Sequence, residues 1–308
     1  MIGSGEIVIN AFRQGLMVPA FNVPYLPMIE PVVRAVADED AFAFVAVARP
    51  EWIKFEATGP AAVAEEFAKW DDPEHVRLHL DHVPVIDEDD LRVDFVPIFR
   101  EAIDVGYQSV MIDASRLDLD GNVRATRQIA DMAHAAGIAC EAELGAILGH
   151  AAGPLPPYDE LYESGMGFTD VAEAERFVRE AGCDWLSVAI GSVHGAISGA
   201  AKDKKKIEAR LNLEHLERLR QATGIPLVLH GGSSVKRDML LAAVNLGIAK
   251  VNVATEIRQA YESALRESGQ VAAAQQAVHD RTVWLLRDYF AVSGTSKCLT
   301  TPNEGQAR

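Results

Sequence analysis

Three histidines stand at positions where they could bind one metal ion together. His82, His194 and His230 each follow a short apolar run. A single histidine in such a place is more often a hydrogen-bonded structural residue, so the prediction depends on finding three. Three imidazoles with an open fourth position describe a catalytic zinc site. The sequence therefore predicts a Zn²⁺ site held by these three side chains.

An aspartate directly precedes the first of these histidines, in the run His79-Leu80-Asp81-His82. A carboxylate beside a metal-bound substrate can remove a hydroxyl proton while the metal polarises the neighbouring carbonyl. Adjacent residues of a regular strand point to opposite faces. Asp81 and His82 can therefore serve one site only if the chain turns where the strand ends, which Pro84 favours. Asp81 is the predicted base, and His79 is either a core residue or a support for the site.

Glycines directly follow two of the candidate ligands. Backbone amides that carry no side chain can approach an anion closely, and the start of a helix adds further donors. A lone Gly-Gly-Ser is usually a plain turn, so its position beside a candidate ligand is what favours phosphate binding. The residues of this predicted anion site are Gly195, Gly231, Gly232, Ser233 and Thr255.

Short apolar runs alternate along the chain with longer amphipathic segments. Nearly continuous apolar runs are typical of strands buried on both faces of a parallel sheet. Eight strands are predicted, over residues 17–23, 41–48, 76–82, 109–115, 139–145, 185–191, 226–232 and 250–255. Predicted helices include residues 122–136, 170–181, 213–223 and 236–246, each ending before a glycine.

Eight such alternations predict an α/β protein with a (β/α)8 TIM barrel, and an open doubly wound sheet is the alternative. In a barrel the carboxyl ends of the strands meet at one face, which carries the chemistry. Phosphate commonly binds there after strands seven and eight. The candidate ligands stand at such strand ends, and residues 231–233 and Thr255 follow the last two predicted strands.

The chain has no clean linker, so residues 1–308 are predicted to form a single domain. Long loops are expected at residues 83–96, which contain a run of acids, and at 146–168, which are rich in glycine and proline. Long loops in a compact domain are often functional. A tail from about residue 293 is expected to be extended or partly disordered. The helical region 259–289 is a candidate surface for contact between subunits.

The composition excludes several classes of protein. The 308 residues carry a formal net charge of −16, with a pI near 5.0. Binding to a phosphate polymer needs a basic surface, so nucleic acid is not the expected partner, although a small anionic substrate is not forbidden. We expect no membrane span and no signal peptide, because neither pattern occurs. The cysteines Cys140, Cys183 and Cys298 make no disulfide framework, which favours the cytoplasm.

Several stretches occur together in a characteristic order. They are Val18-Pro19-Ala20-Phe21-Asn22-Val23, His79-Leu80-Asp81-His82, Ser109-Val110-Met111-Ile112-Asp113, Glu141-Ala142-Glu143-Leu144-Gly145, His194-Gly195, Leu229-His230-Gly231-Gly232-Ser233 and Lys250-Val251-Asn252-Val253-Ala254-Thr255-Glu256. This set resembles the class II, zinc-dependent fructose-bisphosphate and tagatose-bisphosphate aldolase family across roughly residues 15 to 265.

The resemblance implies that the three histidines hold a catalytic Zn²⁺ and that Asp81 deprotonates the C4 hydroxyl of a phosphorylated ketose during cleavage. It implies that Asp113 and Glu143 hold an alternative or second metal position, and a role in supporting the histidines stays open for both. The residues implied in binding the phosphate and hydroxyl groups of the ketone fragment are Gly195, Gly231, Gly232, Ser233, Asn252 and Thr255. A monovalent cation near these glycines and a homodimer or homotetramer are further expectations.

The sequence departs from the family pattern at positions where members of the family contact their substrate. Residues 146–154 lack the usual acidic proton donor, and Ala46 and Ala48, followed by Arg49, replace the usual Gln and Ser. Three hypotheses stay open: an aldolase for fructose or tagatose bisphosphate, a same-mechanism aldolase for a different ketose phosphate, and a noncatalytic metal-binding barrel subunit. Asp81 argues against the last, because metal binding alone would not need that carboxylate.

Overall fold

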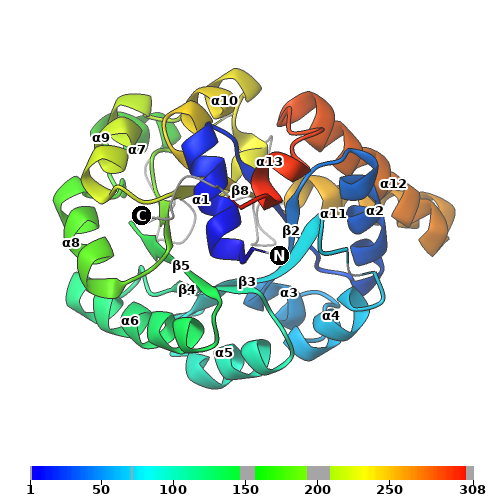
Figure 1. Ribbon diagram of the computed structural model, residues 1–308, viewed down its shortest axis with the longest axis horizontal. Helices are drawn as coiled ribbons and strands as arrows, with labels where there is room; N and C mark the ends of the chain where they lie inside the picture. The colour runs from blue at the N-terminus through cyan, green and yellow to red at the C-terminus, as the bar shows by residue number, and fades with distance from the viewer. Residues whose placement is uncertain (1, 71, 146–156, 193–208, 303–308) are drawn as a thin grey trace.

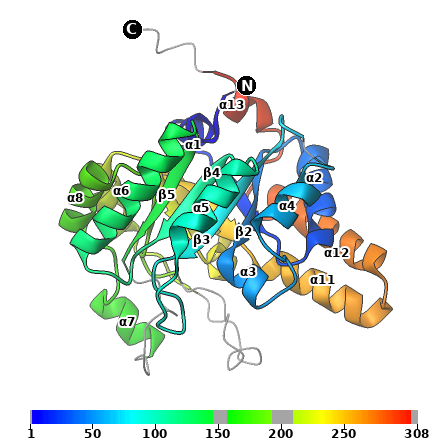
Figure 2. The same ribbon diagram turned by 90° about the horizontal axis from the view of Figure 1, so that it is seen from below.

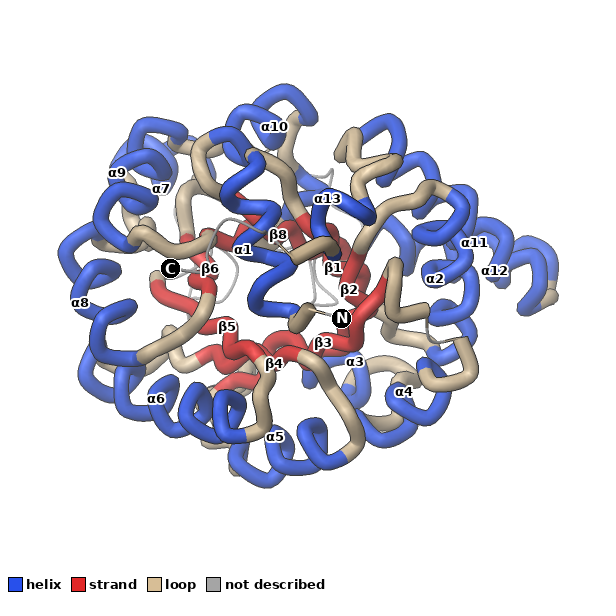
Figure 3. The backbone as a smooth tube through the Cα atoms, in the orientation of Figure 1, coloured by secondary structure: helices blue, strands red, loops and turns tan. Residues whose placement is uncertain are grey.

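The eight predicted strands form a closed parallel barrel in the computed structural model, which describes residues 2–70, 72–145, 157–192 and 209–302. Each strand pairs with its neighbours in the sequence, and β8 pairs with β1 (Figures 1 and 3). The strands are β1 (Val18–Asn22), β2 (Ala43–Ala48), β3 (Val76–Pro84), β4 (Ser109–Asp113), β5 (Ala139–Leu144), β6 (Trp185–Val188), β7 (Leu227–Leu229) and β8 (Ile248–Val253). The TIM-barrel prediction is confirmed, and the open-sheet alternative is wrong because β8 closes onto β1.

Helices surround the barrel between successive strands (Figure 3). The α-helices are α1 (Ser4–Gln14), α2 (Ile29–Asp38), α3 (Arg49–Ile53), α4 (Pro60–Phe67), α5 (Phe95–Asp104), α6 (Leu119–Ala135), α7 (Tyr158–Ser164), α8 (Val171–Ala181), α9 (Leu213–Thr223), α10 (Arg237–Asn245), α11 (Thr255–Ser268), α12 (Val271–Trp284) and α13 (Ser296–Thr300). The described residues also form three short elements: η1 (Leu26–Met28), η3 (Gly232–Ser234) and the π-helical turn η4 (Leu285–Tyr289).

All four specifically predicted helices are present. α6 begins three residues before its predicted start because the Asp118 carboxylate accepts the N–H of Gly121 at 2.7 Å and caps an earlier turn. Asp170 and Asn212 cap α8 and α9 in the same way. Gly182 and Gly224 end these two helices in the left-handed conformation. The sequence predicts this, because a glycine follows each predicted helix.

The amino-terminal end of the barrel is closed by α1 (Figure 1). Its buried residues Ile7 and Val8 join the cluster that contains Phe44 and Trp185 of the barrel interior. The described part of the tail is not extended, contrary to prediction. It forms α13, whose Leu299 is buried in the same cluster, and Asn10 of α1 donates to the Leu299 carbonyl at 2.9 Å. One buried leucine in five residues has too little periodicity to be recognised in the sequence.

The described parts of the two predicted long loops lie at the opposite end of the barrel. β3 continues through Pro84 and α5 begins at Phe95, so the first loop is shorter than expected. It is ordered by a bridge between Ile86 and Arg92. The second predicted loop contains α7, which lies at the end remote from α1 and α13 (Figure 2), while residues 146–156 lie outside the described part of the chain. No helix among the described residues is both long and apolar enough to cross a bilayer.

The barrel interior changes from apolar to polar along its axis. Near α1 it holds aromatic and aliphatic side chains such as Phe44, Trp185 and Val228. Towards the carboxyl ends of the strands, the side chains that share the inner face are buried and polar. They are Asn22, His79, Asp81, Glu141, Glu143, Ser187, Lys250 and Asn252. Because inward residues recur with period two, pairs such as His79 and Asp81 come from the same strand face.

Candidate active site

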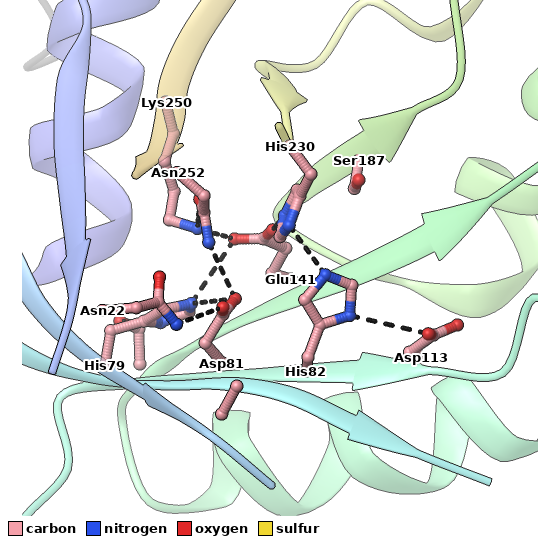
Figure 4. A network of polar contacts seen from close by, with 12 residues as sticks. Asn22, His79, Asp81, His82, Asp113, Glu141, Ser187, His230, Lys250 and Asn252 are labelled. Carbon is pink, nitrogen blue, oxygen red and sulfur yellow. Dashed lines mark hydrogen bonds and ion pairs between the residues drawn. The ribbon is translucent and has the colours of Figure 1, made fainter. Parts of the chain in front are cut away.

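A β-bulge in β3 lets two neighbouring residues face the same site. The register between β3 and β4 shifts between Leu80 and Val83, and His82 has a positive φ of 34°. A bulge re-aims a side chain and is often found beside an active site. Asp81 and His82 consequently both project from β3 into the barrel mouth (Figure 4). The chain is therefore re-aimed by a bulge inside the strand, before Pro84, and not by a turn at the strand end as predicted.

Two predicted metal ligands face each other across the barrel. Nε2 of His82 lies 2.8 Å from Nδ1 of His230. The outer nitrogen of each ring faces a carboxylate: His82 Nδ1 is 3.5 Å from Asp113 Oδ2, and His230 Nε2 is 2.9 Å from Glu141 Oε1 (Figure 4). A carboxylate that accepts the outer N–H of a ring directs its inner nitrogen into the site. The two inner nitrogens lie at hydrogen-bond distance, so a proton lies between them, and a divalent cation fits this arrangement because it can take the place of that proton.

Glu143 adds a carboxylate on the same side as the facing nitrogens. Its Oε2 lies 3.8 Å from Nε2 of His82, whereas Asp113 contacts the opposite ring nitrogen. The donor atoms of His82, Asp113 and Glu143 all lie within 4.8 Å of one another, as do those of Asp81, His82 and His230. Glu143 therefore has the better position to share an ion with the histidines, and Asp113 the better position to orient the His82 ring.

The site is strongly negative once its carboxylates ionise. Burial by itself would lower the pKa of His82, but the charge of Asp81, the hydrogen bond to Asp113 and the charges of Glu143 and Asp113 outweigh burial and raise that pKa to about 10. Burial raises the pKa of Glu143 well above its ordinary value, and the charge of Asp113 adds to this effect. An excess of buried carboxylates beside a histidine is an environment that favours a cation.

The predicted base is held at both oxygens. Asn22 donates to Asp81 Oδ2 at 2.8 Å, and Asn252 donates to Asp81 Oδ1 at 2.9 Å (Figure 4). Burial favours the neutral form of Asp81, but the charges of His82, His230 and Lys250 lower its pKa below the usual value. Asp81 is thus an ionised, oriented carboxylate that is only 2% exposed.

The predicted anion site lies beside these groups. Gly231 has φ 71°, and Gly232 begins the turn η3. A Cβ atom on Gly232 would lie 2.4 Å from Cγ1 of Val251 and 3.5 Å from the backbone oxygen of Asn252. This close packing explains why a glycine is needed there. Ser233 belongs to η3, and Thr255 begins α11 directly after β8.

Two predicted site residues, His194 and Gly195, lie outside the described part of the chain. The structure thus brings together Asp81, His82, Asp113, Glu143, His230 and Asn252.

The sequence did not single out Glu141 and Lys250, although they connect the site. Lys250 Nζ lies 2.7 Å from Glu141 Oε2, and the indole N–H of Trp185 donates to the same oxygen at 2.6 Å. The available signal was the period of two. Glu141 precedes Glu143 by two residues, and Lys250 precedes Asn252 by two residues in an otherwise apolar strand.

An arginine at the end of β2 pairs with the loop after β3. Arg49 Nη1 lies 3.3 Å from Asp87 Oδ2. Asp87 also accepts the N–H groups of Asp89 and Leu91 and the guanidinium of Arg116 at its carbonyl. The acidic loop between β3 and α5 is therefore held in place by contacts of Asp87 at the carboxyl end of the barrel.

Comparison with known proteins agrees with this geometry. Residues 4–296 match the family described as fructose-bisphosphate aldolase class-II. A fructose-bisphosphate aldolase of Geobacillus stearothermophilus is 38% identical over 192 residues, which span 62% of this chain and 58% of that relative. A fructose-bisphosphate aldolase of Staphylococcus aureus strain Mu50 is 30% identical over 269 residues, which span 87% of this chain and 85% of that relative.

The fold is shared with a solved aldolase. The crystal structure of the YdjI aldolase from Escherichia coli K12 superimposes with a TM-score of 0.77 at 26% identity, covering 96% of this chain and 100% of that chain. A family match over nearly the whole chain and a relative that is similar along most of its length lead to one conclusion. This protein belongs to the class II fructose-bisphosphate aldolase family and is an aldolase, that is, a lyase.

Proposed function

We propose that this aldolase reversibly cleaves a phosphorylated ketose to dihydroxyacetone phosphate and an aldehyde, with Asp81 as the base beside a Zn²⁺ site. The observation that carries the proposal is the placement of the Asp81 carboxylate, oriented by two amides, next to the facing nitrogens of His82 and His230. The donor atoms of these three residues lie within 4.8 Å of one another.

The proton transfer is assigned to Asp81. Its ionised carboxylate accepts the proton of the C4 hydroxyl, the C3–C4 bond breaks, and C4 becomes the aldehyde carbonyl of the departing fragment. The electron pair of the broken bond stays with the ketone fragment and is later quenched by a proton at C3. A divalent metal in this position supplies Lewis-acid stabilisation of the negative charge on the ketone.

The metal ligands are proposed as His82 through Nε2, His230 through Nδ1 and His194. Imidazole nitrogens with an open position are typical of catalytic zinc. Glu143 lies where it could provide an alternative position for the ion, and Asp113 orients His82. EDTA treatment followed by the return of one metal at a time, with activity measured after each addition, identifies the metal.

The phosphate of the ketone fragment is assigned to the backbone amides after β7 and to the start of α11. The residues of this proposed site are Gly195, Gly231, Gly232, Ser233, Asn252 and Thr255. Gly231 and Gly232 carry no side chain that would block the approach of an anion to their amides, and the first turn of a helix favours an anion. A monovalent cation beside these glycines is part of the same proposal.

The default substrate is fructose or tagatose bisphosphate. A ketose carrying a single phosphate is the second candidate. The residues at the carboxyl end of β2 favour it. Ala46 and Ala48 offer no polar group, and the charge of Arg49 is already offset by Asp87. Fewer groups at this end of the site are therefore available for a second phosphate.

We further propose that the protein acts in the cytoplasm as a homodimer or homotetramer, without a nucleic-acid or membrane partner. All three cysteines are free, which is usual for a reducing compartment.

The discriminating experiment is a cleavage assay over a panel of ketose mono- and bisphosphates, with the zinc-loaded protein beside the Asp81→Ala variant. Faster cleavage of a monophosphate than of either bisphosphate would select the second candidate. Failure of every substrate with one equivalent of zinc bound would overturn the proposed reaction.

A further inference from the structure

Lys250 is a lysine fully enclosed inside the barrel. Its exposed fraction is 0%, and a buried ammonium is costly unless it is paired and hydrogen-bonded. Two contacts satisfy it: Nζ lies 2.7 Å from Glu141 Oε2 on β5 and donates to Asn252 Oδ1, also at 2.7 Å, on its own strand β8. The ammonium therefore spans the interior from β8 to β5 (Figure 4). Because it is enclosed and doubly engaged, Lys250 acts through its neighbours and does not touch the substrate.

One contact leads from Lys250 to the proposed metal site. Lys250 holds one carboxylate oxygen of Glu141, and the other oxygen lies 2.9 Å from Nε2 of His230. A carboxylate in this position accepts the Nε2–H proton and leaves the Nδ1 lone pair directed at His82. Without the ammonium, the buried Glu141 carboxylate would keep Trp185 and the imidazoles of His230 and His79, whose Nε2 lies 3.6 Å from Oε2, and would lose its strongest cationic partner, so its hold on the His230 tautomer would weaken.

The second contact leads from Lys250 to the proposed base. The ammonium has only donors, so the atom of Asn252 that faces it must be the oxygen. The amide nitrogen then points to Asp81 and donates to Oδ1 at 2.9 Å. An amide turned the other way would present its oxygen to the Asp81 carboxylate, and two acceptors would meet.

We infer that Lys250 is a positioning residue that orients both the proposed metal ligand His230 and the proposed base Asp81. Through Glu141 it selects the ring nitrogen that His230 presents to the metal, and through Asn252 it selects the donor that holds Asp81. The inference rests on the proposed roles of His230 and Asp81.

The test compares Lys250→Met with variants that break one contact each. Glu141→Gln weakens the contact to His230, and Asn252→Leu removes the contact to Asp81. The Zn²⁺ affinity is measured by competition with a chelator in the absence of substrate, and kcat and KM are measured at saturating Zn²⁺. We expect Glu141→Gln to lose mainly Zn²⁺ affinity, Asn252→Leu to lose mainly kcat, and Lys250→Met to lose both, each by about 10- to 100-fold.

Trp185→Phe is the matched control. It removes a neutral donor from the same Glu141 oxygen and leaves the ammonium and Asn252 in place. Its losses should be smaller than those of Lys250→Met in both measurements. Equal losses in the two variants would show that Lys250 has no special role, and wild-type Zn²⁺ affinity and kcat in Lys250→Met would overturn the inference directly.

A double variant covers the case in which Lys250→Met does not fold. Lys250→Met with Glu141→Gln removes both buried charges, so it is expected to fold and still to show a low kcat, because Asn252 has lost its donor. Recovery of the wild-type kcat would overturn the inference. His230→Ala separates the two proposals. If it binds Zn²⁺ as tightly as the wild type, the proposed metal site itself is wrong; if it loses Zn²⁺ while Lys250→Met keeps it, only the inference about Lys250 fails.

Discussion

Nε2 of His82 and Nδ1 of His230 lie 2.8 Å apart, although 148 positions separate the two residues in the chain. The barrel produces this approach because β3 and β7 end at the same face. Each ring is held from behind by a carboxylate, Asp113 for His82 and Glu141 for His230. The inner nitrogens are therefore held in position by contacts that the protein itself supplies.

Removal of the metal should abolish activity and leave the protein folded. The hydrophobic core of the closed barrel is continuous around the strands and is independent of the site. We expect EDTA to reduce cleavage to background, with the far-UV circular dichroism spectrum unchanged and activity restored by Zn²⁺. Global unfolding on chelation would contradict this prediction.

Replacement of Asp81 by asparagine should remove the base and keep the shape of the site. Loss of a general base typically lowers the rate by about 10²- to 10⁴-fold, and we expect that loss in kcat with KM changed much less. Asn22→Ala is the matched variant, because it removes one donor to Asp81 and keeps the carboxylate. It should have the smaller effect on kcat. If Asp81→Asn retained the wild-type kcat, the base would have to be sought elsewhere.

The fold and the main site residues could be predicted because they leave local signals. The apolar runs of the strands are short and continuous, and Asp81, His82 and His230 interrupt them with polar side chains at their ends. Glycines such as Gly182 and Gly224 end helices where the pattern predicts. These features depend on residues that are close in the sequence.

The supporting roles of Glu141 and Asn252 could not be predicted because they depend on contacts between distant strands. Glu141 meets His230 89 positions away, and Asn252 meets Asp81 171 positions away. The direction in which His82 points depends on a bulge that shows only in the pairing of β3 with β4. The helix α13 depends likewise on α1, at the other end of the chain.

A methyl group at Gly232 should damage the proposed phosphate site. The added Cβ would lie 2.4 Å from Cγ1 of Val251, so the turn η3 must move away from β8. Overpacking of this kind typically costs about 1–3 kcal/mol. We expect Gly232→Ala to lower the free energy of unfolding by about this amount and to raise KM for the phosphorylated substrate by roughly 10-fold, which corresponds to about 1.4 kcal/mol.

The control for Gly232→Ala is the double variant with Val251→Ala, which removes the colliding methyl group. It should recover part of the lost affinity for the substrate. An unchanged KM in Gly232→Ala would argue against phosphate binding at this turn.

The buried carboxyl group of Glu51 should make the stability of the protein depend on pH. Glu51 accepts the N–H of Ala48 at 2.7 Å, but burial, supported by the charge of Asp81, raises its pKa from 4.5 to about 8. A raised pKa means that the folded state holds the proton more tightly than the unfolded state. The resulting stability is fully present below pH 4.5 and is lost as the pH rises towards 8. The slope is at most about 1.4 kcal/mol per pH unit.

Glu51→Gln removes this titration and keeps the shape of the side chain. Denaturant unfolding of the wild type and the variant at several pH values between 5 and 8, a range spanned by the two pKa values of Glu51, gives the difference in their free energies of unfolding. Relative to the wild type, the variant should become steadily more stable as the pH rises. Glu65→Gln, at an exposed position of α4, should leave the pH dependence unchanged. A constant difference between Glu51→Gln and the wild type across this range would show that Glu51 does not hold its proton in the folded protein.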